Sequence, residues 1–171
     1  MKFYFRSFSE EMTLNFGRML GKFLVPGMAV LLSGDLGTGK TLLTRGIGES
    51  LGTTRVRSPS FTLVNEYPTG RCTLVHADLY RLKPGDVENL GLQDYLDETC
   101  ILIVEWPDRW QTPPDFEALR IAIETEGETG RIFRMSSLGT KAESALRGLK
   151  EIGLANLELG NLGPENLISE T

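Results

Sequence analysis

The feature that most constrains this chain is the segment 34–41, GDLGTGKT, which matches the phosphate-loop pattern G-x-x-x-x-G-K-[ST] at every fixed position. Glycines at these positions let backbone N–H groups turn inward around phosphate oxygens. The lysine of the pattern reaches the β- and γ-phosphates, and its last hydroxyl ligates Mg2+. The loop follows the apolar run 28–32 and precedes a helical pattern over 41–51, with Gly52 beyond its end. This order of strand, loop and helix predicts a site for a nucleoside triphosphate.

Length and composition favour one domain with an extension. A chain of 171 residues with 40% hydrophobic content can build one sizeable core but is too short for two ordinary domains. We expect an α/β fold of the P-loop NTPase type, with a mixed sheet and flanking helices, over residues 1–135. The stretch 136–171 is expected to be a C-terminal extension, partly helical or disordered.

Several absences point to the cytoplasm as the expected location. The N-terminal segment MKFYFRSFSEEM lacks the apolar stretch of about 7 to 15 residues found in a signal peptide. No apolar run approaches the roughly 20 residues that a membrane-spanning helix needs. Cys72 and Cys100 lie at the edges of apolar runs without metal-binding spacing, so both are expected to be reduced core residues.

Charge is distributed unevenly along the chain. The net charge of -5 argues against the whole protein surface serving to bind nucleic acid. Between Asp35 and Lys83, seven basic residues stand against four acidic ones, a net charge of +3, whereas 84–130 contains twelve acidic and two basic residues, a net charge of -10. The basic segment suits ATP phosphates or an anionic partner surface, and it also fits solvated arginines at helix ends.

Periodicity and turn residues predict the remaining elements. A strand over 3–8 is followed by a helix that Ser9 caps, with Glu10 and Glu11 in its first turn. The other expected elements are a hairpin of strands 62–67 and 72–77, short helices within 82–95, a buried strand over 101–104, a hairpin of 119–125 and 132–135, and a helix over 141–154. The end of the chain, 161–171, is expected to be disordered.

Two acids follow expected strands close to the loop. Glu105 comes directly after the apolar run 101–104, where phosphate-loop proteins place an acid that holds Mg2+. A solvated strand end is the alternative. Asp78 ends the second hairpin strand and is the candidate to orient or deprotonate a water molecule, or else it caps the next segment.

His76 and the segment 58–62 each allow a structural and a functional interpretation. His76 is the only histidine, which excludes metal clusters built from imidazoles, and it is either packed in the core or catalytic. The hydroxyl-rich segment 58–62, SPSFT, lies where a nucleotide-sensing switch would lie, although an ordinary turn also fits. No Asn-Lys-x-Asp motif for guanine is present, so we expect ATP and Mg2+ as the bound cofactors.

The segments GDLGTGKT, SPSFTLVNEY, HADLYRL and IVEWPDRW, in this order and at these separations, resemble the bacterial ATPase subunit of tRNA threonylcarbamoyladenosine biosynthesis, the TsaE family. The resemblance covers roughly 9–135 and departs from the usual family threonine at Ser60, whereas 136–171 has no counterpart that we can align. It implies a small P-loop fold that binds ATP and Mg2+ and docks on the TsaD–TsaB pair. The resemblance further implies that this complex modifies an adenosine next to the anticodon of certain tRNAs and that TsaD carries out the transfer chemistry. Contact of this subunit with tRNA is expected to be indirect.

The resemblance also assigns roles to matching positions. Lys40 and Thr41 correspond to phosphate and Mg2+ contacts, Glu105 to a Mg2+ ligand and Asp78 to an essential acid near the γ-phosphate. Glu10 matches a position near the nucleotide base, and Trp106 matches a family tryptophan with an expected packing or partner role. The expected site therefore has Asp78 and Lys40 as catalytic residues, Thr41 and Glu105 as metal ligands, and Glu10, Asp35, Leu36, Gly37, Thr38, Gly39, Lys40 and Thr41 as nucleotide-binding residues.

Two other functional classes stay open at this point. Compact P-loop kinases of small molecules have a similar length, but they carry an arginine-rich lid, and the acidic stretch 84–130 contains only Arg109 and Arg120. A nucleotide-gated binding module without hydrolysis is the third hypothesis.

Overall fold

The computed structural model of the chain describes residues 2–83, 85–158 and 166–168. Its strands are β1 (Lys2–Ser7), β2 (Met28–Ser33), β3 (Val64–Pro68), β4 (Thr73–Asp78), β5 (Cys100–Glu105), β6 (Glu117–Glu126), β7 (Gly130–Leu138) and β8 (Leu167–Ile168). The α-helices are α1 (Glu10–Gly21), α2 (Lys40–Leu51) and α3 (Thr140–Glu158), and the 3-10 helices are η1 (Val87–Leu90), η2 (Leu92–Tyr95) and η3 (Pro107–Arg109).

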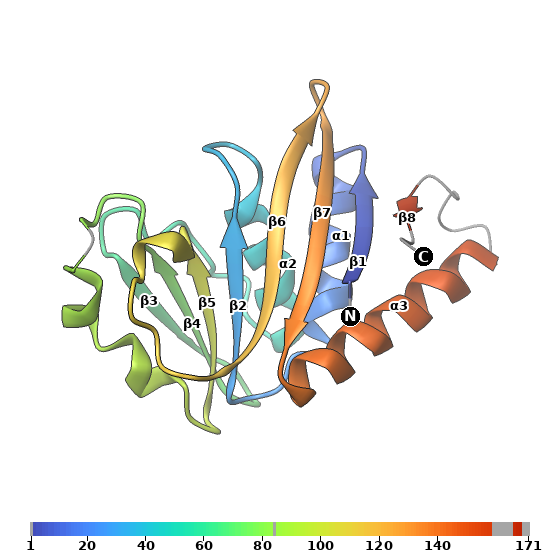
Figure 1. Cartoon of the computed structure of the whole chain (residues 1–171). Helices are drawn as coiled ribbons and strands as arrows, with labels where there is room; N and C mark the ends of the chain where they lie inside the picture. Colours follow the sequence, from blue (N-terminus) through green and yellow to red (C-terminus); the bar gives the residue numbers. More distant parts are fainter. Residues whose placement is uncertain (1, 84, 159–165, 169–171) are drawn as a thin grey trace.

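The strands form one mixed sheet in the order β3-β4-β5-β2-β6-β7-β1-β8 (Figure 1). The four central strands β4, β5, β2 and β6 run parallel to one another, whereas β3–β4, β6–β7, β7–β1 and β1–β8 are antiparallel pairs. The expected α/β fold with a mixed sheet and flanking helices is confirmed. Because the carboxyl ends of parallel strands meet at one edge, the loops after β2, β4 and β5 lie together.

Local sequence signals explain where most elements begin and end. Ser9 caps α1, because its side chain accepts a hydrogen bond of 3.1 Å from the backbone N–H of Met12. Helix α2 ends at Gly52, which adopts the left-handed conformation with φ 103° that favours glycine at this position. The two expected hairpins are present as β3–β4 and β6–β7, and β5 is buried along its whole length between β4 and β2.

Apolar side chains fill both faces of the sheet. On one face, α1, α2 and α3 pack on a cluster in which the rings of Phe5 and Phe16 stack at 4.1 Å between centroids. The opposite face is covered by the chain between β4 and β6, whose Leu79, Val87 and Leu92 are completely buried. Cys100 is buried and Cys72 is half-buried, and both are free thiols, as expected.

The C-terminal part continues this packing beyond the predicted boundary at 135. Strand β7 extends to Leu138, and α3 buries Ala142, Ala145, Leu146 and Leu149 in the same core as α1 and α2. The segment 161–171, expected to be disordered, contains β8, whose pairing satisfies backbone groups on the outer edge of β1. Residues 161–165 and 169–171 lie outside the described residues. In the part of the chain that the structure describes, no helix combines the length and the apolar character needed to cross a membrane.

Candidate functional site

The phosphate loop joins β2 to α2 at the edge where the parallel strands end. Gly34, Gly37 and Gly39 have φ values of 138°, 80° and 100°, a region that side chains with a Cβ rarely adopt. Among the described residues, no side chain caps the first turn of α2 and no acid lies in that turn. The first backbone N–H groups of α2 therefore form an anion-binding site at the positive end of the helix.

Lys40 is the first residue of α2 and folds back over the loop. Its Nζ donates hydrogen bonds of 2.7 Å and 2.8 Å to the carbonyl oxygens of Gly34 and Asp35. The same nitrogen lies 4.4 Å from the ring centroid of Trp106. Burial lowers the pKa of Lys40, while the negative charges of Glu105, Asp78 and Asp35 oppose this shift. Phosphate oxygens are charged acceptors and bind an ammonium group more strongly than neutral carbonyls do.

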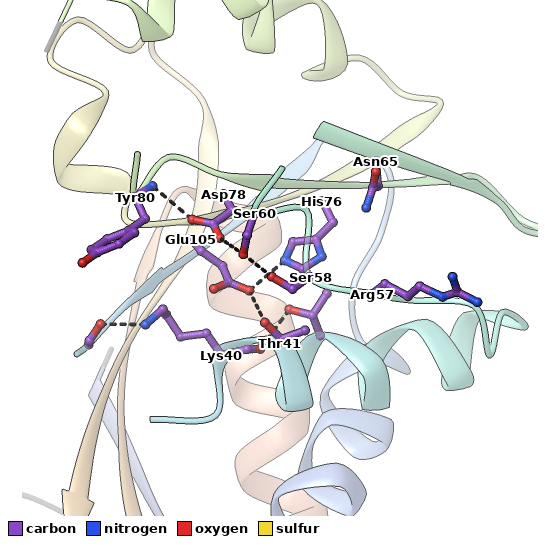
Figure 2. Close-up of polar contacts among 12 residues, drawn as sticks. Lys40, Thr41, Arg57, Ser58, Ser60, Asn65, His76, Asp78, Tyr80 and Glu105 are labelled. Carbon is purple, nitrogen blue, oxygen red and sulfur yellow. Dashed lines mark hydrogen bonds and ion pairs between the residues drawn. The ribbon is translucent and has the colours of Figure 1, made fainter. Parts of the chain in front are cut away.

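Thr41 and Glu105 form a second contact across the site. The hydroxyl of Thr41 donates to Glu105 Oε1 at 3.0 Å, and His76 Nε2 lies 2.8 Å from the same oxygen (Figure 2). Glu105 is only 4% exposed. It ends β5 directly opposite Asp78 of β4 in the strand register. The two acids identified from sequence are therefore neighbours, because the parallel pairing brings both strand ends to one edge.

Asp78 connects the loop site to the hydroxyl-rich segment 58–62. Ser60 Oγ donates to Asp78 Oδ2 at 3.2 Å, and the hydroxyls of Ser58 and Ser60 are 2.5 Å apart. The other carboxylate oxygen accepts a hydrogen bond of 3.0 Å from the backbone N–H of Tyr80. Asp78 therefore caps the next segment, as one interpretation expected, and also faces the site, as the other did.

These residues surround a hollow of about 240 Å³, which we call the loop pocket. Its lining consists of Leu36, Gly37, Gly39, Lys40, Thr41, Leu42, Ser58, Ser60, Asp78, Glu105 and Trp106. Asp35 and Thr38 lie outside this set and shape the loop instead, since the Thr38 hydroxyl donates to the carbonyl of Asp35 at 3.0 Å. Glu10 is exposed at the start of α1 and is also absent from the described lining.

Two further residues contact the loop or Lys40, and of these only Trp106 was given a role beforehand, the packing or partner role that the resemblance implied. Arg131 on β7 donates from Nε to the carbonyl of Thr38 at 3.0 Å, a contact between residues far apart in the chain. Trp106 has a left-handed backbone with φ 59° and packs its ring between Lys40 and Tyr80. No local signal identifies Arg131, whereas Trp106 could be found because it follows the acid that ends β5.

The arginines of the basic segment lie apart from the loop pocket. Arg45, Arg55 and Arg57 line a separate hollow of about 340 Å³, together with Glu49, Thr54 and Val56. In Figure 2, the side chain of Arg57 points away from Lys40 and Glu105. Among the described residues of the basic segment, only Lys40 contributes its positive charge to the loop pocket. These three arginines therefore do not line the loop pocket, and the alternatives of an anionic partner surface and of solvated arginines stay open.

The donor set fits Mg2+ that arrives with a nucleotide. Among the described residues, no group of three or more histidine, cysteine, aspartate or glutamate side chains is placed to hold a metal ion. Thr41 and Glu105 instead offer one hydroxyl and one carboxylate close together. This matches the sparse protein coordination of Mg2+ in phosphate-loop sites, where phosphates and water supply the other ligands.

Comparison with known proteins assigns the chain to a family. The family model described as threonylcarbamoyl adenosine biosynthesis protein TsaE matches residues 7–133. The chain belongs to the TsaE family. TsaE proteins take part in the biosynthesis of threonylcarbamoyladenosine in tRNA. The resemblance that four ordered segments indicated is thus confirmed.

Relatives and a solved structure extend the match beyond the motifs. The TsaE protein of Bacillus subtilis is 36% identical over 139 residues, which cover 81% of this chain and 87% of the relative. The TsaE protein of Nostoc sp. is 46% identical over 110 residues, or 61% of this chain and 68% of the relative. The crystal structure of Bacillus subtilis YdiB superposes with a TM-score of 0.78 at 31% identity, covering 90% of this chain and 97% of that one.

Proposed function

We propose that this chain is a Mg2+-dependent ATPase that supports the complex forming threonylcarbamoyladenosine next to the anticodon of tRNA. The convergence of Lys40, Thr41, Asp78 and Glu105 on one pocket carries the proposal. These residues come from three separate segments, and each supplies the group that ATP hydrolysis needs at its position. Membership of the TsaE family supports the link to tRNA modification.

Each side chain has a distinct role in the proposed reaction. Lys40 exchanges its two loop carbonyls for the β- and γ-phosphate oxygens, while the N–H groups of the loop and α2 hold the phosphates in place. Thr41 and Glu105 would hold Mg2+, which would supply positive charge against the phosphates. Asp78 orients the attacking water, and its own orientation is maintained by Ser60 and the backbone of Tyr80.

We further propose that the chain acts in the cytoplasm by docking on the TsaD–TsaB pair, which carries out the transfer and binds the tRNA. Three exposed side chains near the loop pocket support a docking surface, namely Leu36 at 65%, Phe61 at 86% and Tyr80 at 40% exposure. Apolar side chains that gather beside a site are typical of protein contacts. Hydrolysis would then drive the cycle of the complex and would not phosphorylate a small substrate.

The test of nucleotide binding compares Lys40→Ala with Lys83→Ala, an exposed lysine outside the loop pocket. We expect Lys40→Ala to weaken binding of a fluorescent ATP analogue by about 10- to 150-fold, because a hydrogen bond to a charged group contributes about 1.5–3 kcal/mol. Lys83→Ala should bind as the unmodified protein does. Equal affinities of the two variants for the ATP analogue would refute the assignment of Lys40 as a phosphate ligand.

Two further measurements test hydrolysis and pathway. Glu105→Ala and Asp78→Ala should abolish phosphate release in the presence of the TsaD–TsaB pair while keeping nucleotide binding in EDTA. Release that persists in both variants would favour a binding module without catalysis. Cells depleted of the protein should contain less threonylcarbamoylated tRNA, and unchanged levels would refute the proposed role in this pathway.

A further inference from the structure

We propose that His76 is a positioning residue that fixes the carboxylate of Glu105 for its contact with Mg2+. This inference rests on the proposed function, because it requires that Mg2+ binds beside Thr41 and Glu105. His76 is not itself among the residues that line the loop pocket, but it contacts one of them, Glu105. It acts through Glu105 alone.

The placement of His76 on β4 explains how it reaches this carboxylate. Successive side chains of a strand point to opposite faces, so Leu74, His76 and Asp78 share the face that packs on α2. His76 is opposite Ile103 in the register with β5, and Glu105 is the next residue on the same face of β5. The imidazole is completely buried and meets Glu105 Oε1 at 2.8 Å (Figure 2).

The hydrogen-bond inventory of the imidazole points to function and not to packing. An ionised carboxylate only accepts hydrogen bonds, so His76 Nε2 carries the hydrogen that binds Glu105. Among the described groups, the other ring nitrogen, Nδ1, is buried without a hydrogen-bond partner. Burying a polar group that stays unpaired lowers stability, and an apolar side chain would fill this position without that cost. Among the described residues, the one hydrogen bond of the His76 imidazole is therefore its contact with Glu105.

Glu105 needs such a contact because a single hydrogen bond, the one from Thr41, does not fix the orientation of its carboxylate. The terminal torsion of a glutamate is broad, and Asp78 is a like charge directly opposite in the register. His76 and Thr41 both donate to Oε1. Among the described residues, Oε2 accepts no hydrogen bond. Holding Oε1 on two donors therefore presents Oε2 to the loop pocket as the free metal-binding oxygen.

The decisive comparison uses two amides of different length. In His76→Gln the side-chain N–H can reach the position of Nε2, whereas in His76→Asn it reaches only the position of Nδ1. His76→Leu removes the donor but fills the space, and Leu74→Val is the control for packing, since Leu74 lies on the same face of β4 without a polar group. Each variant is titrated with a fluorescent ATP analogue, first in EDTA and then with increasing Mg2+, and its thermal unfolding is recorded.

We expect all folded variants to bind the nucleotide in EDTA as the unmodified protein does. Mg2+ raises the affinity for the nucleotide, and the Mg2+ concentration that gives half of this increase is the quantity compared. For His76→Asn and His76→Leu this concentration should be about 10- to 100-fold higher, the usual effect of losing a group that orients a metal ligand. His76→Gln and Leu74→Val should keep the Mg2+ response. Because His76→Gln and His76→Asn are both polar, their comparison holds even where His76→Leu does not fold.

The outcomes separate this inference from the proposed function. If Mg2+ does not raise the affinity of the unmodified protein for the ATP analogue, the proposed metal site is wrong, and the proposed role of His76 is then wrong as well. If the unmodified protein responds to Mg2+ and His76→Asn responds equally, only the role of His76 is refuted. A double variant, His76→Asn with Glu105→Gln, should need no more Mg2+ than Glu105→Gln alone, and an additive loss would also refute it.

Discussion

At the scale of single residues, two glycines of the phosphate loop, Gly34 and Gly37, are required for different physical reasons. Gly34 and Gly37 both have positive φ values, 138° and 80°. A Cβ on Gly34 would lie 2.4 Å from the carbonyl oxygen of Ile123 on β6, whereas one on Gly37 meets no described atom within 4 Å. Gly34 is therefore required for close approach as well as for conformation, and Gly37 for conformation alone.

This difference predicts unequal effects of two alanine substitutions. Gly37→Ala should lower the free energy of unfolding by about 1–2 kcal/mol, the cost of a left-handed backbone with a Cβ. Gly34→Ala should lower it by more, because the loop or β6 must also move. Urea unfolding of both variants measures the difference, and equal losses would show that the contact with Ile123 relaxes without cost.

At the scale of elements, hydrogen bonds between side chains link segments that the sheet itself does not join. The hydroxyl of Tyr95 in η2 donates to Glu66 Oε1 on β3 at 2.5 Å. The hydrogen bond to Glu66, with smaller contributions from burial and nearby charge, raises the pKa of Tyr95 to about 12. The edge strand β3 is thus tied to the chain that covers one face of the sheet.

This link predicts a pH dependence with a defined sign. The folded-state pKa of Tyr95 lies above its ordinary value of about 10, so the hydrogen bond stabilises the fold fully below pH 10. The stabilisation is lost as the pH rises through about 12. Glu66→Gln should bring the pKa of Tyr95 back toward about 10, which the phenolate absorbance can measure against Tyr95→Phe. An unchanged titration curve would refute the contact.

At the scale of the whole molecule, the C-terminal part belongs to the core. Helix α3 covers β6 and β7 on the side of α1, and four of its residues are buried against them (Figure 1). The domain boundary predicted at 135 would cut β7 before its last three residues. Burial of large apolar side chains contributes about 1.5–3 kcal/mol each, so losing Leu146 and Leu149 removes a large share of a typical stability of about 5–15 kcal/mol.

Truncation tests this boundary directly. A chain of residues 1–135 should lose its cooperative thermal transition in circular dichroism, because the face beneath α3 becomes exposed. Among the described residues, a chain of residues 1–158 keeps α3 and loses the two-residue strand β8 and the buried Asn166, whose side chain donates to the carbonyl of Arg6 at 2.9 Å. It should therefore unfold at a temperature much closer to that of the full chain than the chain of residues 1–135 does. Folding of 1–135 with full stability would instead support the boundary drawn from sequence.

Much of the fold and part of the site were predictable because their causes are local. The loop glycines, the Ser9 cap and the hairpin turns each depend on residues within a few positions, and the buried strand β5 follows from one short apolar run. The pairing of Asp78 with Glu105 was partly predictable, since both end strands of one parallel sheet. The contact of Arg131 with Thr38 was not, because the two residues are 93 positions apart in the chain and meet only through the place of β7 in the sheet.

The sequence by itself therefore determined which chemistry this protein carries: a phosphate loop, two acids at strand ends and a family whose members share them. Residue types and short spacings encode these features, and they hold before any folding. The tertiary structure decided which of the candidate groups meet. It placed His76 on Glu105 and left Arg45, Arg55 and Arg57 outside the loop pocket. Strand order and register settle such contacts, because they depend on how distant segments pack together to bury their apolar faces.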